Sequence, residues 1–130
     1  MKAIKGSCHC KAVEFEAQFA GEIETSKCNC SICRKTRFWK TLVPADAFKI
    51  VKGQKALVTY MFGSKSVEHC SCGNCGVKVF GTVSMEDTNL VAISVPCLDL
   101  EPELLAKLPV SFEDGLHDAY ENEPGVLSYL

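Results

Sequence analysis

Most of the nine cysteines in this chain fall into three short clusters, and these clusters constrain the fold more than any other feature. The clusters are Cys8-x-Cys10, Cys28-x-Cys30-x-x-Cys33 and Cys70-x-Cys72-x-x-Cys75, while Cys97 stands alone. An odd number of cysteines at such short spacings favours metal binding over disulfide bonds. Thiolates suit zinc, and four of them complete a tetrahedral site, whereas iron–sulfur clusters use other spacings. The sequence therefore predicts turns held together by zinc.

The spacings leave open how the clustered thiols divide between two ions. Cys8 and Cys10 can bind one ion together, because side chains at i and i+2 of an extended segment share a face. In one arrangement the structural ion has four ligands, which are Cys8, Cys10, Cys72 and Cys75. The second ion then has three, which are Cys28, Cys30 and Cys33, and it keeps an open position as catalytic zinc does. In the other arrangement Cys70 completes the second site, so both sites are closed and structural.

The apolar residues between the clusters follow the pattern of β-strands. Residues 13–19 alternate strictly between apolar and polar, which predicts a half-buried strand. Further strands are expected where β-branched and aromatic residues gather, at residues 41–43, 48–51, 56–62, 77–83 and 90–95. Only residues 102–107 have helical signals, and the surrounding stretch, 99–114, looks peripheral. We therefore predict a mainly β fold and a single zinc-binding domain spanning residues 1–130.

Charge is distributed unevenly along the chain. Residues 1–78 contain 13 Lys and Arg against 6 Asp and Glu, whereas residues 79–130 contain 1 against 10. Arg34 and Lys35 directly follow Cys33, and such cations suit the carboxylates of a small anionic substrate. The alternative is that they are solvated or only balance the charge of the thiolates. The net charge of −2 and the lack of a basic tail make nucleic acid an unlikely partner.

The sequence has no feature of a membrane or secreted protein. No apolar run approaches the length of a membrane span, and no apolar signal core follows the first lysines. We therefore expect a cytoplasmic protein with reduced thiols and no membrane partner. The sequence does not indicate an oligomeric state.

A few other residues are candidates for the site. His69 is next to Cys70, and it is a candidate proton carrier or spare ligand because histidine titrates near neutral pH. Phe38 and Trp39 are candidates for lining a substrate cleft, with core packing as the alternative. Cys97 is expected to be a small buried apolar residue.

The cysteine motifs and their flanks resemble those of a known family. They are Gly6-Ser7-Cys8-His9-Cys10, Cys28-Asn29-Cys30-Ser31-Ile32-Cys33-Arg34-Lys35 and Cys72-x-x-Cys75-Gly76. In this order they resemble the glutathione-dependent formaldehyde-activating enzyme family, which also includes centromere protein V. The likeness covers roughly residues 4–100. The chain departs from the family at Lys11, where glycine is frequent, at Ser71, where an aromatic residue is usual, and at Cys70.

The resemblance implies a Mss4-like β fold with two zinc ions per chain. Carried over by motif, the structural zinc ligands are Cys8, Cys10, Cys72 and Cys75. The catalytic zinc ligands are Cys28, Cys30 and Cys33, and we expect partial occupancy there because only three protein ligands hold the ion.

The resemblance also implies an activity, that of a carbon–sulfur lyase. A thiol bound at the open zinc position loses its proton and becomes a nucleophile. The expected substrate is a small thiol such as glutathione or its aldehyde adduct, with S-hydroxymethylglutathione formed or cleaved and Arg34 and Lys35 binding the substrate. The alternative is a non-catalytic zinc-stabilised binding module in which both zinc sites are closed.

Overall fold

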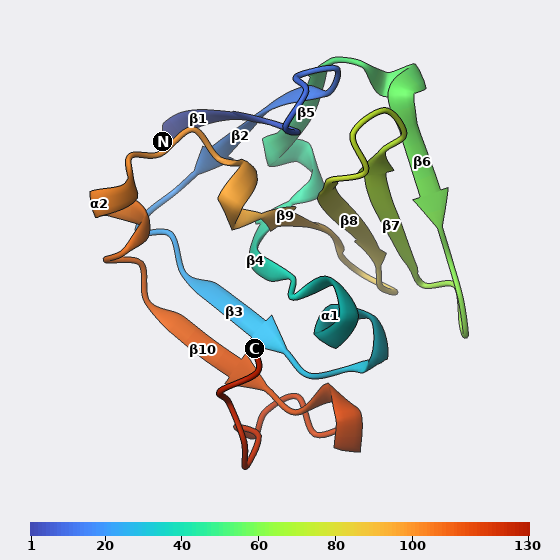
Figure 1. The fold of residues 1–130 in the computed structure, drawn as a ribbon, viewed down its shortest axis with the longest axis vertical. Coiled ribbons are helices and arrows are strands. Elements are labelled where there is room, and N and C mark those ends of the chain that lie inside the picture. Colours follow the sequence, from blue (N-terminus) through green and yellow to red (C-terminus); the bar gives the residue numbers. More distant parts are fainter.

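The computed structural model describes residues 1–130, which form two β-sheets (Figure 1). The smaller sheet is antiparallel and has the order β1-β2-β5, with β1 at Lys2–Ser7, β2 at Glu14–Phe19 and β5 at Phe48–Lys52. The larger sheet has the order β10-β3-β4-β9-β8-β7-β6. Its strands are β3 (Thr25–Cys28), β4 (Trp39–Pro44), β6 (Leu57–Tyr60), β7 (Val67–Cys72), β8 (Lys78–Ser84), β9 (Asn89–Ser94) and β10 (Val110–Glu113). The predicted mainly β fold is confirmed.

Helices are few and short. They are α1 (Ser31–Thr36) and α2 (Pro102–Leu105), with 3-10 turns η1 (Ala45–Ala47), η2 (Gln54–Ala56), η3 (Val95–Cys97) and η4 (Gly115–His117). Pro102 begins α2, where its fixed φ and missing N–H fit the first turn. None of these helices has the length and apolar character that crossing a membrane requires.

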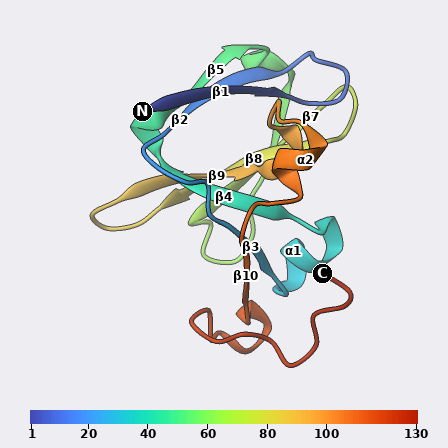
Figure 2. The same ribbon diagram turned by 90° about the vertical axis from the view of Figure 1, so that its left-hand side faces the viewer.

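The hydrophobic core lies between the two sheets. The alternation along β2 buries Phe15, Ala17 and Phe19 against the larger sheet. Aromatic rings then connect the layers, because the centroid of Phe48 lies 5.2 Å from that of Phe15 and 4.7 Å from that of Phe80 on β8. Figure 2 shows the smaller sheet at one end of the molecule and β10 with the C-terminal segment at the other.

The larger sheet has a second face, which is turned away from this core. Leu42 on β4 pairs with Ala92 on β9, and Val83 on β8 pairs with Leu90 on β9. Because side chains alternate between faces, these residues point opposite to core residues such as Ile93. Leu42 remains 47% exposed, so this face is apolar without being covered.

Several elements were not expected from the sequence. The missed strands are β1, β3, β7 and β10, and α1 was missed as a helix. The stretch 99–114 is not peripheral, because β10 pairs in parallel with β3, with Val110 opposite Thr25. Cys8 and Cys10 lie in the turn after β1 rather than in an extended segment. Sequence patterns could not reveal these features because the segments are short, rich in polar residues or paired with distant parts of the chain.

Candidate metal centres and the adjoining cavity

Four thiols from two loops form the first cluster. Cys8 and Cys10 come from the β1–β2 loop, Cys72 ends β7, and Cys75 lies in the β7–β8 turn. All four Sγ atoms lie within 4.8 Å of one another. The Sγ atom of Cys10 is 3.7 Å from those of both Cys8 and Cys72. A tetrahedron with zinc–sulfur bonds of about 2.3 Å has edges of about 3.8 Å, so this cluster fits zinc.

Donors around the first cluster prepare its thiols to bind a cation. The backbone N–H of Val13 points at Cys8 Sγ, and the N–H groups of Asn74 and Cys75 point at Cys72 Sγ. Hydrogen bonds from the backbone lower the pKa of the Cys75 thiol to about 6, whereas burial raises the pKa of Cys8 to about 11. A buried thiolate such as Cys8 therefore needs a metal ion beside it.

Lys11 has a backbone conformation that favours glycine. It ends the Cys8–Cys10 turn with a φ of +63°. This left-handed conformation is strained for a residue with a Cβ atom and free of strain for glycine. The turn therefore keeps its shape here against a small local strain.

Three thiols form the second cluster around the start of α1. Cys28 ends β3, Cys30 is the N-cap of α1, and Cys33 lies in its first turns. Their Sγ atoms lie within 4.8 Å of one another, and the N–H of Cys30 donates to Cys28 Sγ over 3.4 Å. Hydrogen bonds from Cys28 and Cys33 lower the pKa of Cys30 to about 2, while the pKa of Cys33 is raised. The trio thus holds one negative charge easily, and further ionisation calls for a cation such as zinc.

The C-terminal segment closes over the second cluster. Asn29 is buried between the cysteines, and its Nδ2 donates to Asp114 Oδ1 while its Oδ1 accepts from the N–H of Leu116, both over 2.9 Å. Gly115 lies so close that a Cβ atom there would be 2.6 Å from Cys28 Sγ. These contacts could not be predicted from sequence patterns, since they join residues more than 80 positions apart.

Cys70 belongs to neither cluster. Its thiol is buried, and its contacts are the Thr59 hydroxyl and the Glu68 carbonyl, each at 3.9 Å. Cys97 is buried as expected, with its thiol directed at the carbonyl of Lys78. The four-thiol and three-thiol clusters therefore include neither Cys70 nor Cys97.

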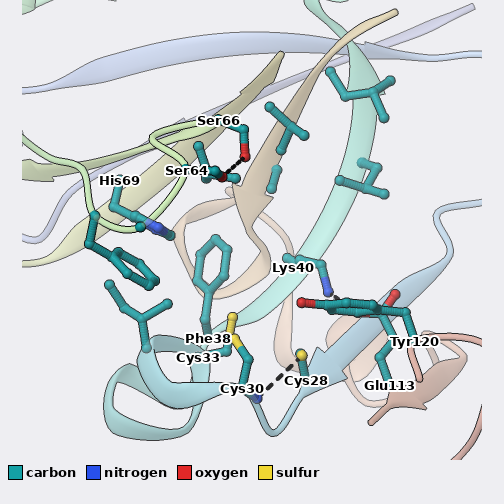
Figure 3. A pocket seen from close by; sticks show the side chains of 18 of the residues that line it. Cys28, Cys30, Cys33, Phe38, Lys40, Ser64, Ser66, His69, Glu113 and Tyr120 are labelled. Carbon is teal, nitrogen blue, oxygen red and sulfur yellow. Dashed lines mark hydrogen bonds and ion pairs between the residues drawn. The ribbon is translucent and has the colours of Figure 1, made fainter. Parts of the chain in front are cut away.

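The three-thiol cluster lies at one end of a cavity of about 580 Å³ (Figure 3). Phe38 stands beside the thiols, and His69 faces Lys40 and Tyr120 across the space. Trp39 does not line the cavity, since its indole N–H donates to Thr25 instead. Of the two aromatic candidates, only Phe38 therefore reaches the cavity.

Two lysines and one histidine supply the basic groups of the cavity. Lys40 is paired with Glu113, with 2.6 Å between Nζ and Oε1. Lys78 Nζ lies 2.9 Å from His69 Nδ1 and 3.9 Å from the centroid of the Phe38 ring. Burial lowers the pKa of both Lys78 and His69, and the charge of Lys78 lowers that of His69 further. His69 is thus a hydrogen-bond acceptor for Lys78 rather than a metal ligand.

Arg34 and Lys35 lie outside this cavity. Both are exposed in the last turn of α1, and the Arg34 guanidinium lies 6.0 Å from the centroid of the Tyr129 ring. Their role in binding substrate stays a prediction. The sequence analysis looked for cations next to Cys33 and so missed Lys78. The signal that could have found it is a lysine at the start of the otherwise apolar strand β8.

The chain is similar to known proteins in sequence and in fold. The family model described as glutathione-dependent formaldehyde-activating enzyme matches residues 3–112. A solved structure of a Rhodobacter sphaeroides protein, a structural genomics target, is similar with a TM-score of 0.70 and 26% sequence identity. The similarity covers 82% of this chain and 99% of that one.

Proposed function

Because this chain belongs to the glutathione-dependent formaldehyde-activating enzyme family, we propose that it is a carbon–sulfur lyase. It would make or break the bond between the sulfur of a small thiol such as glutathione and the carbonyl carbon of an aldehyde, with S-hydroxymethylglutathione as the formaldehyde adduct. The observation that carries the proposal is the three-thiol cluster at one end of a cavity. Three protein ligands leave one zinc position for a substrate.

Each part of the site has a role in this reaction. Zinc held by Cys28, Cys30 and Cys33 would lower the pKa of a substrate thiol and so supply a nucleophilic thiolate. In the forming direction the sulfur bonds to the aldehyde carbon, and the carbonyl oxygen takes up a proton. In the cleaving direction the hydroxyl loses that proton, the carbon–sulfur bond breaks and the aldehyde leaves.

Lys78 is the residue best placed to donate a hydrogen bond to the aldehyde oxygen. An ammonium has three N–H donors, and one of them points at His69. The others are available to the carbonyl oxygen of an aldehyde in the cavity. Arg34 and Lys35 would bind glutathione carboxylates that extend outside the cavity along α1.

The alternative of a binding module with two closed sites is less well supported. It needs a fourth thiol at the second cluster, and Cys70 was the candidate. The Cys70 thiol instead contacts Thr59 and is not among the clustered sulfurs.

Cobalt substitution tests the proposal, because the visible spectrum of cobalt reports the number of thiolates around it. We expect two cobalt ions per chain, one with four thiolates and one with three. Glutathione should shift the bands of the second ion, and S-methylglutathione, whose thiol is blocked, should not. Cys70→Ser should leave both spectra unchanged, as should the control Cys97→Ser. Two four-thiolate spectra, one of them altered in Cys70→Ser, would instead identify a closed structural module.

A further inference from the structure

The cavity beside the three-thiol cluster is larger and more apolar than a one-carbon aldehyde requires. Its volume of about 580 Å³ lies in the range of pockets that bury ligands of drug size. We propose that the preferred substrate is a thiol adduct whose sulfur carries an apolar substituent of several carbons, bound by Leu42, Leu90 and Ala92. This inference rests on the proposed function and specifies the aldehyde of that reaction.

The apolar wall of the cavity is built by the second face of the larger sheet. Leu42 lies opposite Ala92, and Leu90 lies opposite Val83, so these side chains form a continuous strip across β4, β9 and β8. Met85 extends the strip and is 60% exposed. Large apolar side chains left in water favour an apolar ligand, since covering them removes that surface from water.

Small residues deepen the middle of this wall. Ala92 pairs with Gly81, which adds no side chain to the floor. A larger side chain in place of Ala92, which lines the cavity, would reduce the space for a bound substituent.

The strip is connected to the thiols along β4. Phe38, Lys40 and Leu42 occupy alternate positions, and all three line the cavity. A substituent on a sulfur bound at the cluster therefore passes Phe38 and reaches Leu42, while its oxygen stays near Lys78. The reaction remains the addition of a thiol to an aldehyde and its reversal. In the addition the carbon–sulfur bond forms as the carbonyl π bond breaks, the proton lost by the thiol is balanced by one taken up on oxygen, and no oxidation state changes.

The charges of the cavity argue against filling it with glutathione itself. Glutathione has two carboxylates and an ammonium group. Lys40 is neutralised by Glu113, which leaves Lys78 as the one lysine in the lining without a carboxylate partner. Two buried carboxylates would find too few partners, so the charged ends of the thiol belong outside and the apolar substituent inside.

Calorimetric titration of the zinc-loaded protein tests this inference without turnover. The probes are S-methylglutathione and S-hexylglutathione, which differ only in chain length. Each buried methylene group strengthens binding about fourfold, so burial of half of the added ones makes S-hexylglutathione bind about thirtyfold tighter. Leu42→Asp should bring the two affinities within about threefold, because a carboxylate then faces the chain. Leu104→Asp is the matched control, since Leu104 is 48% exposed but lies on α2 away from this cavity, and it should keep the wild-type ratio.

The outcomes separate the inference from the proposed function. Equal affinities for the two probes would overturn the inference that the cavity binds an apolar substituent. They would leave the lyase proposal standing. Failure of S-hexylglutathione to bind, with glutathione still shifting the cobalt bands, would overturn the apolar substituent alone, whereas failure of both glutathione and S-hexylglutathione to bind would overturn both proposals. A hexyl preference that survives in Leu42→Asp would overturn the assignment of this wall.

Discussion

Lys78 is held in the cavity by two neighbours of different kinds. The face of the Phe38 ring attracts its positive charge, and neutral His69 accepts one of its hydrogen bonds. Burial meanwhile lowers the pKa of Lys78, which makes its proton easier to transfer. A lysine in these surroundings is positioned to donate a hydrogen bond to an oxygen in the cavity.

Replacement of Lys78 should therefore affect turnover more than binding. We expect Lys78→Met to lower kcat about 100-fold, the size typical for a lost proton donor, with a smaller change in KM. Steady-state kinetics of adduct formation measure both constants. Lys27→Met is the control, because Lys27 packs on Trp39 outside the cavity. An unchanged kcat in Lys78→Met would remove Lys78 from the mechanism.

His69 should make stability depend on pH. Its pKa is lowered in the folded protein, so below about pH 6.5 the unfolded state binds more protons than the folded state. The contribution of His69 is complete above this pH and is lost as the pH falls. The free energy of unfolding should thus drop more steeply from pH 7.5 to 5.5 in the wild type than in His69→Phe. Denaturant titrations of both zinc-loaded proteins measure this difference, in which the shared effect of zinc release cancels, and parallel curves would contradict it.

The C-terminal segment is the element that shapes the second cluster. It has no ligand of its own, yet Asn29, Asp114 and Gly115 bring it against Cys28. Neighbours of metal ligands orient those ligands, and changing them commonly weakens metal binding.

Gly115→Ala should therefore loosen the second zinc ion. The new methyl group would displace Cys28 Sγ, and we expect the affinity of this site to fall about 10- to 100-fold while the four-thiol site keeps its affinity. Competition with a coloured chelator measures both sites. Gly125→Ala in the same segment is the control, since nothing lies within 4 Å of a Cβ atom there. Equal losses at the two sites would indicate general destabilisation instead.

Strands were predictable where apolar and polar residues alternate or β-branched residues gather, and unpredictable elsewhere. β2 follows from strict alternation, and β8 and β9 follow from their β-branched residues. β7 lacks this pattern, because polar His69 faces the cavity on one side of the sheet while cysteines such as Cys70 take the core positions on the other side. The parallel pairing of β3 with β10 has no local signal. The cysteine spacings identified the candidate ligands but not how they divide between the two clusters. That division depends on where β7 places the side chain of Cys70.

At the scale of the whole molecule, the four-thiol cluster links the two sheets. Its ligands come from the loop that joins β1 to β2 in the smaller sheet and from the turn that joins β7 to β8 in the larger one. An ion there constrains how the layers meet. The three-thiol cluster, in contrast, spans only β3 and α1.

Metal removal should consequently proceed in two steps. A mild chelator should first take the ion from the three-thiol site and abolish activity with little change in Tm. Removal of the second ion, or Cys72→Ser, should lower Tm by about 10 °C or more, because binding of a structural zinc ion contributes directly to folding. Calorimetry with parallel metal analysis measures both steps, and a single step in which metal loss and unfolding coincide would contradict this order.

The parallel pairing of β10 with β3 affects how the protein matures during its synthesis. The ribosome releases Cys28, Cys30 and Cys33 early, and the last ligand of the four-thiol site follows at Cys75. The partners that cover Cys28, from Val110 to Leu116, emerge only afterwards. A nascent chain thus exposes the three thiols of the second cluster to oxidants and competing metals until the segment around Leu116 has emerged, while all four ligands of the site that joins the sheets are already available.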